Sequence, residues 1–177
     1  MSLRIRDNPL PDIYVLDLPV HKDARGTFVK TYNDALFKDL DLDFQVLESF
    51  HSVSAVNVLR GMHYQRGHSS HSKLVYCLSG SILDVVVGID PKKSSFNKCF
   101  AIKLDADCGQ SLLIGKGYAH GFLSLQDNSL VSYMTSTIHD PSADTGVLWS
   151  SISFEWPIQR PILSNRDQNH PPIHQLA

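Results

Sequence analysis

The sequence predicts an all-β fold, a sandwich or barrel of antiparallel strands. Short runs of β-branched and aromatic residues recur at near-regular spacing, with turn residues between them. No long helical pattern alternates with these runs, which argues against a doubly wound sheet. A chain of 177 residues can bury one sizeable core, and no linker or internal repeat divides it, so we predict a single domain over 1–177.

The predicted strands follow in order along the chain, and Gly, Pro, Asn and Asp cluster between them. Residues 84–87, Asp-Val-Val-Val, are too apolar for an exposed edge, so this strand is expected inside a sheet. The strand patterns cover 13–18, 27–32, 45–53, 74–78, 82–89, 96–104, 111–114, 121–125 and 130–137.

One short helix is expected at 33–40, where Asn33 could cap the first turn and Ala35, Leu36 and Leu40 form an apolar side. From Asn165 onward the chain is rich in Pro, His, Asn and Gln, and we predict a loose tail from about residue 168.

Composition excludes several classes of function. A net charge of −2 with mixed signs gives no footprint for nucleic acid or an anionic membrane. No apolar run approaches the roughly 20 residues of a membrane span, and the N-terminus lacks the apolar stretch of a signal peptide. Cys77, Cys99 and Cys108 fit neither a disulfide framework nor a metal motif, so we expect free thiols and a cytoplasmic protein.

The stretch 57–65, Asn-Val-Leu-Arg-Gly-Met-His-Tyr-Gln, carries the strongest chemical signal. It places Arg60 and His63 three residues apart in a segment suited to an interior strand, and Lys73 heads the next apolar run. Burying an unpaired polar or charged side chain in an interior strand costs free energy. Together they could supply an anion clamp, a base and a partner for an oxyanion. The alternative for His63 alone is a satisfied core histidine beside a surface arginine.

A second stretch, 114–122, sets glycines around His120. It predicts a tight turn that lets backbone approach a ligand or another strand. A turn between core strands needs glycine as well, so His120 either lines a cavity or simply belongs to that turn.

Several ordered motifs resemble the nucleotide-sugar 3,5-epimerases, whose type member acts on dTDP-4-dehydro-6-deoxyglucose on the way to dTDP-rhamnose. The resemblance implies a cupin-type antiparallel β-sandwich (jelly roll), a nucleotide-diphosphate sugar substrate, usually a homodimer, and no metal or redox cofactor. The matching pieces are Asp23-Ala24-Arg25-Gly26, 58–65, Lys73-Leu74-Val75, Gly80, 117–122, Tyr133, Trp149, Trp156-Pro157 and 163–167.

The resemblance also implies roles for individual residues. His63 matches the base, Asp167 the carboxylate that orients it, Lys73 the cation beside the sugar C4 oxygen, and Tyr133 the group that returns a proton from the opposite face. A proton α to a ketone is weakly acidic, so such an enzyme needs a base and a group that stabilises the enolate.

Substrate-binding positions follow in the same way. Arg25 and Arg60 match residues that hold the diphosphate, for which a guanidinium fork is well suited. Phe28 matches an aromatic near the nucleotide, although an ordinary core Phe is an equal alternative. Arg166 stands where a lysine is usual, and His120 belongs to a matched motif.

Other recognition positions depart from the family pattern. Glu48 and Phe50 replace the usual Gln-x-Asn, and His139 stands at the second position of a Tyr-Tyr pair. We take Glu48 and His139 as substrate-binding candidates. Either the nucleotide or sugar differs from the usual one, or these sites have drifted. The remaining departures are Lys30, Ile138, Asp144 and Ser150-Ser151.

Other functions remain open at this point. A C3-only epimerase or a 3,4-ketoisomerase could use the same fold, and so could a non-catalytic sugar-nucleotide binder. A metal-dependent cupin could draw on His63, His68, His71 and His120, but its usual His-x-His pair is absent here.

Overall fold

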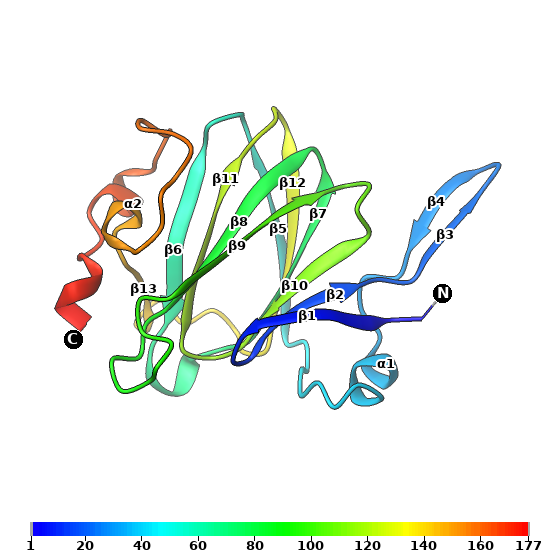
Figure 1. The fold of residues 1–177 in the computed structure, drawn as a ribbon, viewed down its shortest axis with the longest axis horizontal. Coiled ribbons are helices and arrows are strands. Elements are labelled where there is room, and N and C mark those ends of the chain that lie inside the picture. The colour runs from blue at the N-terminus through cyan, green and yellow to red at the C-terminus, as the bar shows by residue number, and fades with distance from the viewer. Residues whose placement is uncertain (1, 177) are drawn as a thin grey trace.

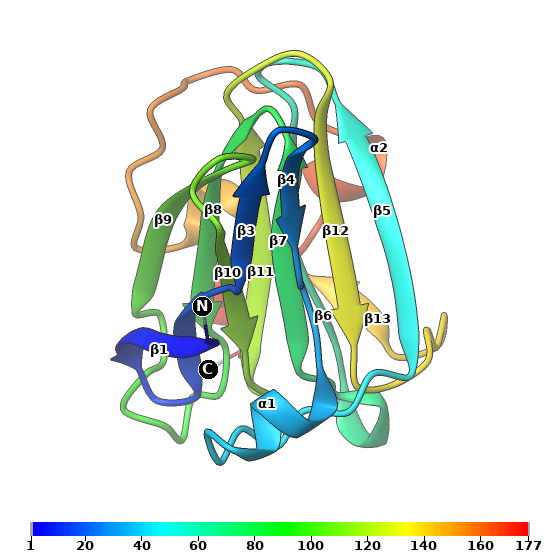
Figure 2. The same cartoon turned by 90° about the vertical axis from the view of Figure 1, so that its right-hand side faces the viewer.

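The computed structural model describes residues 2–176 as a sandwich of two antiparallel sheets (Figures 1 and 2). The predicted all-β antiparallel sandwich is confirmed. One sheet has the order β1 (Arg4–Leu10), β2 (Ile13–Asp17), β10 (Gln110–Ile114), β7 (Lys73–Ser79), β12 (Ser129–Thr135), β5 (Glu48–Ser54). The other has the order β13 (Asp144–Gly146), β6 (Leu59–Gln65), β11 (Tyr118–Ser124), β8 (Ser81–Gly88), β9 (Cys99–Asp105).

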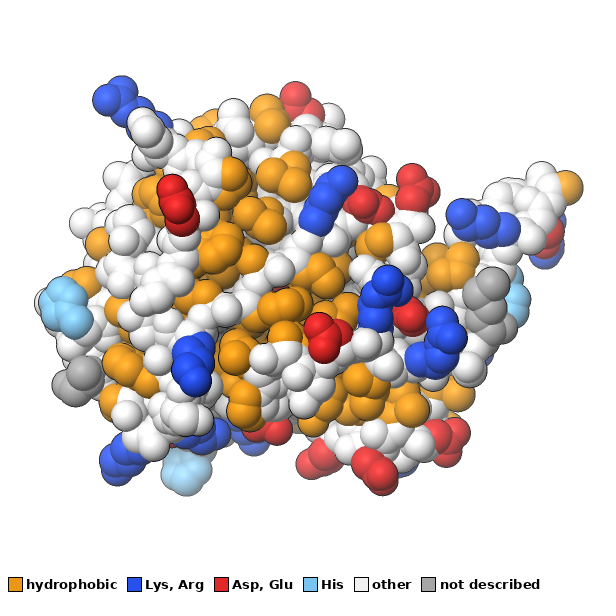
Figure 3. Space-filling view, viewed as in Figure 1, with side chains coloured by type: hydrophobic (Ala, Val, Ile, Leu, Met, Phe, Trp, Pro, Cys, Tyr) orange, Lys and Arg blue, Asp and Glu red, His pale blue; other side chains and the backbone are white. Residues whose placement is uncertain are grey.

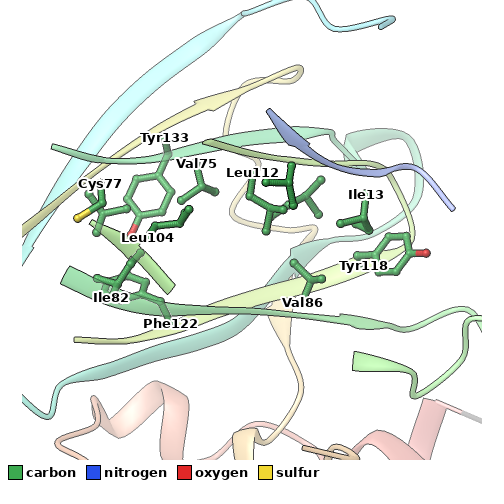
Figure 4. Packing of buried hydrophobic residues seen from close by; sticks show 13 residues of the cluster. Ile13, Val75, Cys77, Ile82, Val86, Leu104, Leu112, Tyr118, Phe122 and Tyr133 are labelled. Carbon is green, nitrogen blue, oxygen red and sulfur yellow. The ribbon is translucent and has the colours of Figure 1, made fainter. Parts of the chain in front are cut away.

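The core lies between the two sheets. Val75, Leu112 and Tyr133 point from the first sheet toward Val86 and Phe122 of the second (Figure 4). Each side chain is at most 6% exposed, and full burial of such an apolar side chain is worth about 1.5–3 kcal/mol. β8 lies between β11 and β9, so the apolar run 84–87 is interior as predicted.

A hairpin stands apart from both sheets. It consists of β3 (Val20–Asp23) and β4 (Gly26–Val29), which pair only with each other (Figures 1 and 3). The predicted strand 27–32 therefore ends early, at Val29. The side chain of Phe28 is exposed, so it is not a core residue.

The predicted helix is present as α1 (Asp34–Lys38) and is capped as expected. Asn33 Oδ1 accepts a hydrogen bond from Leu36 N at 3.1 Å. Phe37 is the fully buried residue of this helix, and it packs on Tyr32 and Phe44. Leu36 and Leu40 are only partly buried, because the helix lies at the edge of the sandwich.

Some boundaries differ from the sequence prediction. β11 begins at Tyr118, so the glycine turn ends earlier than expected and His120 lies inside a strand. β5 begins at Glu48 rather than at residue 45. The exposed edge strand β1, the hairpin strand β3 and the three-residue β13 were not predicted, because none of them shows an alternating apolar pattern.

β6 and β11 approach each other closely at a pair of glycines. Gly61 has φ +134°, and an ideal Cβ built on it would lie 2.5 Å from the Cα of Gly121. Such a distance leaves no room for a side chain. Glycine at 61 thus sets the spacing of the two strands that carry His63 and His120.

The C-terminal segment covers the outer face of β6, and its helix is α2 (Asn165–Gln168) (Figure 1). The tail predicted to be loose from about residue 168 is instead packed. Leu148 N donates to Pro171 O at 2.8 Å, Ile173 N donates to Ser151 Oγ at 2.9 Å, and Ile173 is 3% exposed. Burial of apolar Ile173 outweighs the polar composition around it.

Both tryptophans lie beneath this segment. Their rings are 6.2 Å apart at the centroids, and Trp156 Nε1 donates to Trp149 O at 3.1 Å. Phe154 meets Trp156 edge to face. They belong to a second apolar cluster, on the far side of the β6–β11–β8 sheet from the main core.

No helix among residues 2–176 is long and apolar enough to cross a membrane.

Candidate active site

A cavity of about 280 Å³ lies between the two sheets. β5, β7 and β12 supply one wall, and β6, β11 and β13 supply the other. This arrangement brings together most of the predicted site residues. The lining residues are Glu48, Phe50, Ser52, Arg60, His63, Tyr64, Gln65, His71, Lys73, His120, Phe122, Tyr133, Thr135, Thr137, His139, Asp144 and Arg166.

His63 forms a short pair with Asp167 behind the cavity wall. The distance from His63 Nε2 to Asp167 Oδ1 is 2.7 Å, although the residues are 104 positions apart. Ser164 Oγ accepts from Asp167 N at 3.1 Å and so fixes the first turn of α2. Gly61 N donates to Asp167 Oδ2 at 3.2 Å. Both carboxylate oxygens are therefore held.

The electrostatics keep this carboxylate ionised. Burial by itself would raise the pKa of Asp167, but the hydrogen bond and charge of His63, with the N–H of Gly61, lower it overall. An ionised Asp167 accepts a hydrogen bond from the Nε2–H of His63, which leaves Nδ1 with a free lone pair. His63 is 30% exposed and lines the cavity, so this nitrogen can act as a base.

Lys73 is the first residue of β7 and supplies the cation of the site. Burial lowers the pKa of its ammonium to about 8, while the negative charges of Asp84 and Asp144 act in the opposite direction. The group is still mostly protonated at neutral pH, and a weakly solvated ammonium interacts strongly with a developing oxyanion.

Tyr133 faces the cavity from the opposite sheet to His63. Its hydroxyl is 3.0 Å from Ser52 Oγ, and its ring stacks on Phe50 with centroids 4.9 Å apart and planes at 19°. Burial raises the pKa of Tyr133 far above its usual range, so its hydroxyl retains the proton. The group is a proton donor in a fixed position.

His120 is bound to a carboxylate that sequence reasoning missed. Its Nε2 lies 2.9 Å from Asp84 Oδ2, and both side chains are at most 5% exposed. Burial lowers the pKa of His120, and Asp84 opposes this effect. His120 thus lines the cavity rather than a turn. Asp84 could not be singled out because it lies in an apolar strand.

The rim of the cavity carries polar groups from several elements. Glu48 Oε2 accepts from His139 N at 2.7 Å, which joins β5 to the loop after β12. Arg60 donates to Ser54 Oγ at 3.0 Å and so spans both sheets. Arg166 pairs with Asp144 at 2.8 Å.

Two predicted residues lie elsewhere. Arg25 and Phe28 are on the β3–β4 hairpin, line a separate depression and do not reach this cavity. Arg25 pairs with Asp23 at 2.6 Å and is 91% exposed. The spatial grouping expected for these residues is therefore not present within one chain.

The histidines considered for a metal centre are not assembled as one. His68 is exposed in the turn after β6, and His120 is bound to Asp84. His71 lines the cavity, and burial lowers its pKa to about 4. Sequence reasoning also missed His170, whose side chain is buried beside Asp167. It was missed because it lies in a polar, Pro-rich segment that was predicted to be a loose tail.

Comparison with known proteins agrees with this geometry. The family model for dTDP-4-dehydrorhamnose 3,5-epimerase matches residues 7–175. The enzyme of that name from Escherichia coli K12 is 39% identical over 163 residues, covering 90% of this chain and 88% of its own length.

Two solved structures are also similar. The Bacillus anthracis dTDP-4-dehydrorhamnose 3,5-epimerase, with TDP and PPi bound, has a TM-score of 0.93 at 29% identity, covering 97% of this chain and 99% of its own. A 3'-monoepimerase from Streptomyces bikiniensis, in complex with dTDP-quinovose, has a TM-score of 0.85 at 26% identity. The match covers 92% of this chain and 84% of the monoepimerase. The chain therefore belongs to the dTDP-4-dehydrorhamnose 3,5-epimerase family and is an isomerase.

Proposed function

We propose that this enzyme inverts C3 and C5 of dTDP-4-keto-6-deoxyhexose through enolate intermediates, with His63 as base, Asp167 as its partner, Lys73 as enolate stabiliser and Tyr133 as acid. The observation that carries the proposal is the placement of His63 and Tyr133 on opposite walls of one cavity. Inversion needs proton removal on one face of the sugar and return on the other, and this arrangement provides both.

The protonation state of each residue suits the step that we assign to it. Nδ1 of His63 removes the proton α to the C4 carbonyl, and Asp167 stabilises the imidazolium that forms. Lys73 binds the C4 oxygen as negative charge develops there, an interaction that could be worth about 3–4 kcal/mol. Tyr133 then donates its proton from the other sheet. The set needs no metal and no redox cofactor.

The size of the cavity indicates how the substrate lies. Small-molecule pockets span roughly 300–1,000 Å³, so this one accommodates the hexose while the nucleotide extends beyond the rim. Arg60 at the rim can pair with the diphosphate. Glu48 and His139, which also line the cavity, would contact the sugar or nucleoside.

A homodimer is the arrangement that would complete the site. The β3–β4 hairpin projects from the body (Figure 3). Arg25 and Phe28 on this hairpin are exposed. Val53 and Leu78, on β5 and β7, are also exposed apolar residues. We propose that each hairpin reaches the rim of a partner's cavity, where Arg25 and Phe28 would contact the nucleotide. We further propose one domain over 1–177 and, from the free thiols of Cys77, Cys99 and Cys108, a cytoplasmic location.

A C3-only epimerase is the second candidate, because a 3'-monoepimerase shares this fold. The retained Tyr133, as the opposed proton donor, favours two inversions. A ketoisomerase or a pure binder would not need His63 and Tyr133 on opposed walls.

Proton NMR with dTDP-4-keto-6-deoxyglucose in D₂O tests these alternatives. Loss of the C3 and C5 proton signals, with inverted product trapped by a reductase, is expected. Exchange at C3 alone would identify a 3-epimerase, and a new carbonyl position an isomerase. His63→Ala should abolish exchange at both carbons, whereas Tyr133→Phe should retain exchange and lose inverted product. Wild-type exchange in His63→Ala would refute the base assignment.

A further inference from the structure

His63, Asp167 and His170 form a compact cluster at the back of the site. Their ligand atoms all lie within 4.8 Å of one another. His170 Nε2 is 3.5 Å from the same Asp167 oxygen that His63 contacts at 2.7 Å. The His170 side chain is 7% exposed, and its Nε2 has no hydrogen-bond partner among the described residues. A buried polar atom of this kind costs free energy, so its position requires an explanation.

The sheet holds the second imidazole in place. Gly146 on β13 pairs in register with His63, and an ideal Cβ at Gly146 would lie 2.5 Å from His170 Nε2. Only glycine leaves room for this ring. The rings of His63 and His170 meet edge to face, with centroids 5.6 Å apart. The site is therefore built by the backbone and is not a chance contact of flexible side chains.

We propose that these three residues form an inhibitory site for a divalent transition metal ion, with Zn²⁺ as the best fit. Two imidazole nitrogens, a carboxylate oxygen and one water make a common tetrahedral zinc set, whereas Mg²⁺ and Ca²⁺ prefer oxygen ligands alone. Bonds of zinc length place ligand atoms about 3.3 Å apart in a tetrahedron. The His170–Asp167 distance already matches this separation, and the His63–Asp167 pair must open by about 0.6 Å.

The surroundings provide an entry path and support. A surface depression lined by Val58, Ile162 and Ser164 reaches both His63 and Asp167, and it shares His63 with the substrate cavity. The second oxygen of Asp167 stays bound to Gly61 N, which orients the carboxylate as in known metal sites.

Occupancy would switch off the base, an argument that rests on the proposed function. In the free enzyme His63 carries its proton on Nε2 and uses the Nδ1 lone pair. A metal ion takes the Nε2 lone pair, so the proton moves through solvent to Nδ1, with no net gain or loss. A protonated Nδ1 cannot accept the substrate proton. The ion is thus an inhibitor and not a cofactor.

Cobalt titration of the chelator-treated full chain tests the site directly. Co²⁺ should give the visible absorption of a four-coordinate complex, saturate near one equivalent and be displaced by Zn²⁺. His170→Ala and His170→Phe should weaken binding by at least about tenfold, since each removes a ligand. The phenylalanine variant fills the ring space beside Gly146 and so guards against misfolding. His68→Ala, which alters an exposed histidine, should bind like wild type.

Deuterium exchange measured in parallel separates the two proposals. Zn²⁺ should abolish exchange in wild type, and chelator should restore it. Absence of the cobalt band in wild type, or an unchanged band in both His170 variants, would overturn the metal site. If the metal bound fully and the rate of deuterium exchange did not fall, the site would stand but the inhibition would be overturned. If the metal-free wild type did not exchange, the proposed function would fail while the cobalt spectrum still decided the metal site.

Discussion

At the scale of single residues, the site depends on which nitrogen of His63 holds its proton. Asp167 fixes this choice, because it accepts from Nε2 at 2.7 Å and is held in turn by Gly61 and Ser164. The protonation of Lys73 also depends on its surroundings, because burial lowers the pKa of its ammonium group. Each of these two effects leads to a prediction that can be measured.

Asp167→Asn should lower the rate of exchange by roughly 10²–10⁴ with little change in KM. The new amide would donate to Nε2, force the proton onto Nδ1 and so remove the base. Asp167 does not line the cavity, which is why KM should hold. Asp144→Asn is the matched control: it alters a cavity carboxylate paired with Arg166, and should change KM more than rate. A wild-type rate in Asp167→Asn would contradict the dyad.

The rate should also fall at alkaline pH because of Lys73. Its pKa is lowered to about 8, and in the proposed mechanism only the protonated form stabilises the enolate. Activity is therefore present below this pH and should drop about tenfold per unit above it. Lys73→Arg keeps the charge at all accessible pH values, so its residual activity should lack this alkaline fall. The same fall in Lys73→Arg would assign it to another group.

The sequence pointed to the candidate catalytic residues more successfully than to the residues that contact them. His63 and Asp167 are adjacent in space, as the family resemblance implied, although the roles remain a proposal. Asp84 was missed because it lies in a run of valines, and His170 because its segment is polar and Pro-rich. Arg25 was taken from the same resemblance, but it lies on the hairpin outside the cavity, because sequence patterns do not contain the positions of distant segments.

At the scale of elements, the spacing of β6 and β11 is set by glycines. Gly61 and Gly121 let the two backbones approach so that His63 and His120 can share one wall of the cavity. The runs of apolar residues predicted most strands, but not the register that makes these glycines necessary. Register depends on contacts between distant segments, which local patterns do not contain.

Gly61→Ala should destabilise the fold and can be judged against Gly26→Ala. Both glycines have positive φ, +134° and +121°, but only at Gly61 would the new Cβ meet backbone; at Gly26 nothing lies within 4 Å. The clash should cost about 1–3 kcal/mol more than the strain of positive φ alone. Urea unfolding of both variants measures this difference. Equal losses would show that β6 and β11 can separate without penalty.

At the scale of the whole molecule, the body and the hairpin have different roles. The cavity of the sandwich is lined by His63, Lys73 and Tyr133 of the proposed catalytic set. The β3–β4 hairpin, which carries Arg25 and Phe28, projects away from the sandwich (Figure 1). If hairpins complete partner sites, activity belongs to the pair of chains and not to each chain alone.

Mixing two inactive variants tests this idea. Arg25→Ala and His63→Ala each disable a site, but a mixed dimer would contain one intact site. Random exchange of subunits should therefore restore about a quarter of wild-type sites. No recovery after confirmed subunit exchange would mean that the hairpin does not act across the dimer.

The position of the two tryptophans makes intrinsic fluorescence a probe of one part of the fold. Trp149 and Trp156 both lie under the C-terminal segment, and neither belongs to the main core between the sheets. Intrinsic fluorescence will therefore report on the segment that holds Asp167 and His170, while far-ultraviolet circular dichroism reports on the strands. Release of that segment would change the emission spectrum before the sandwich itself unfolds.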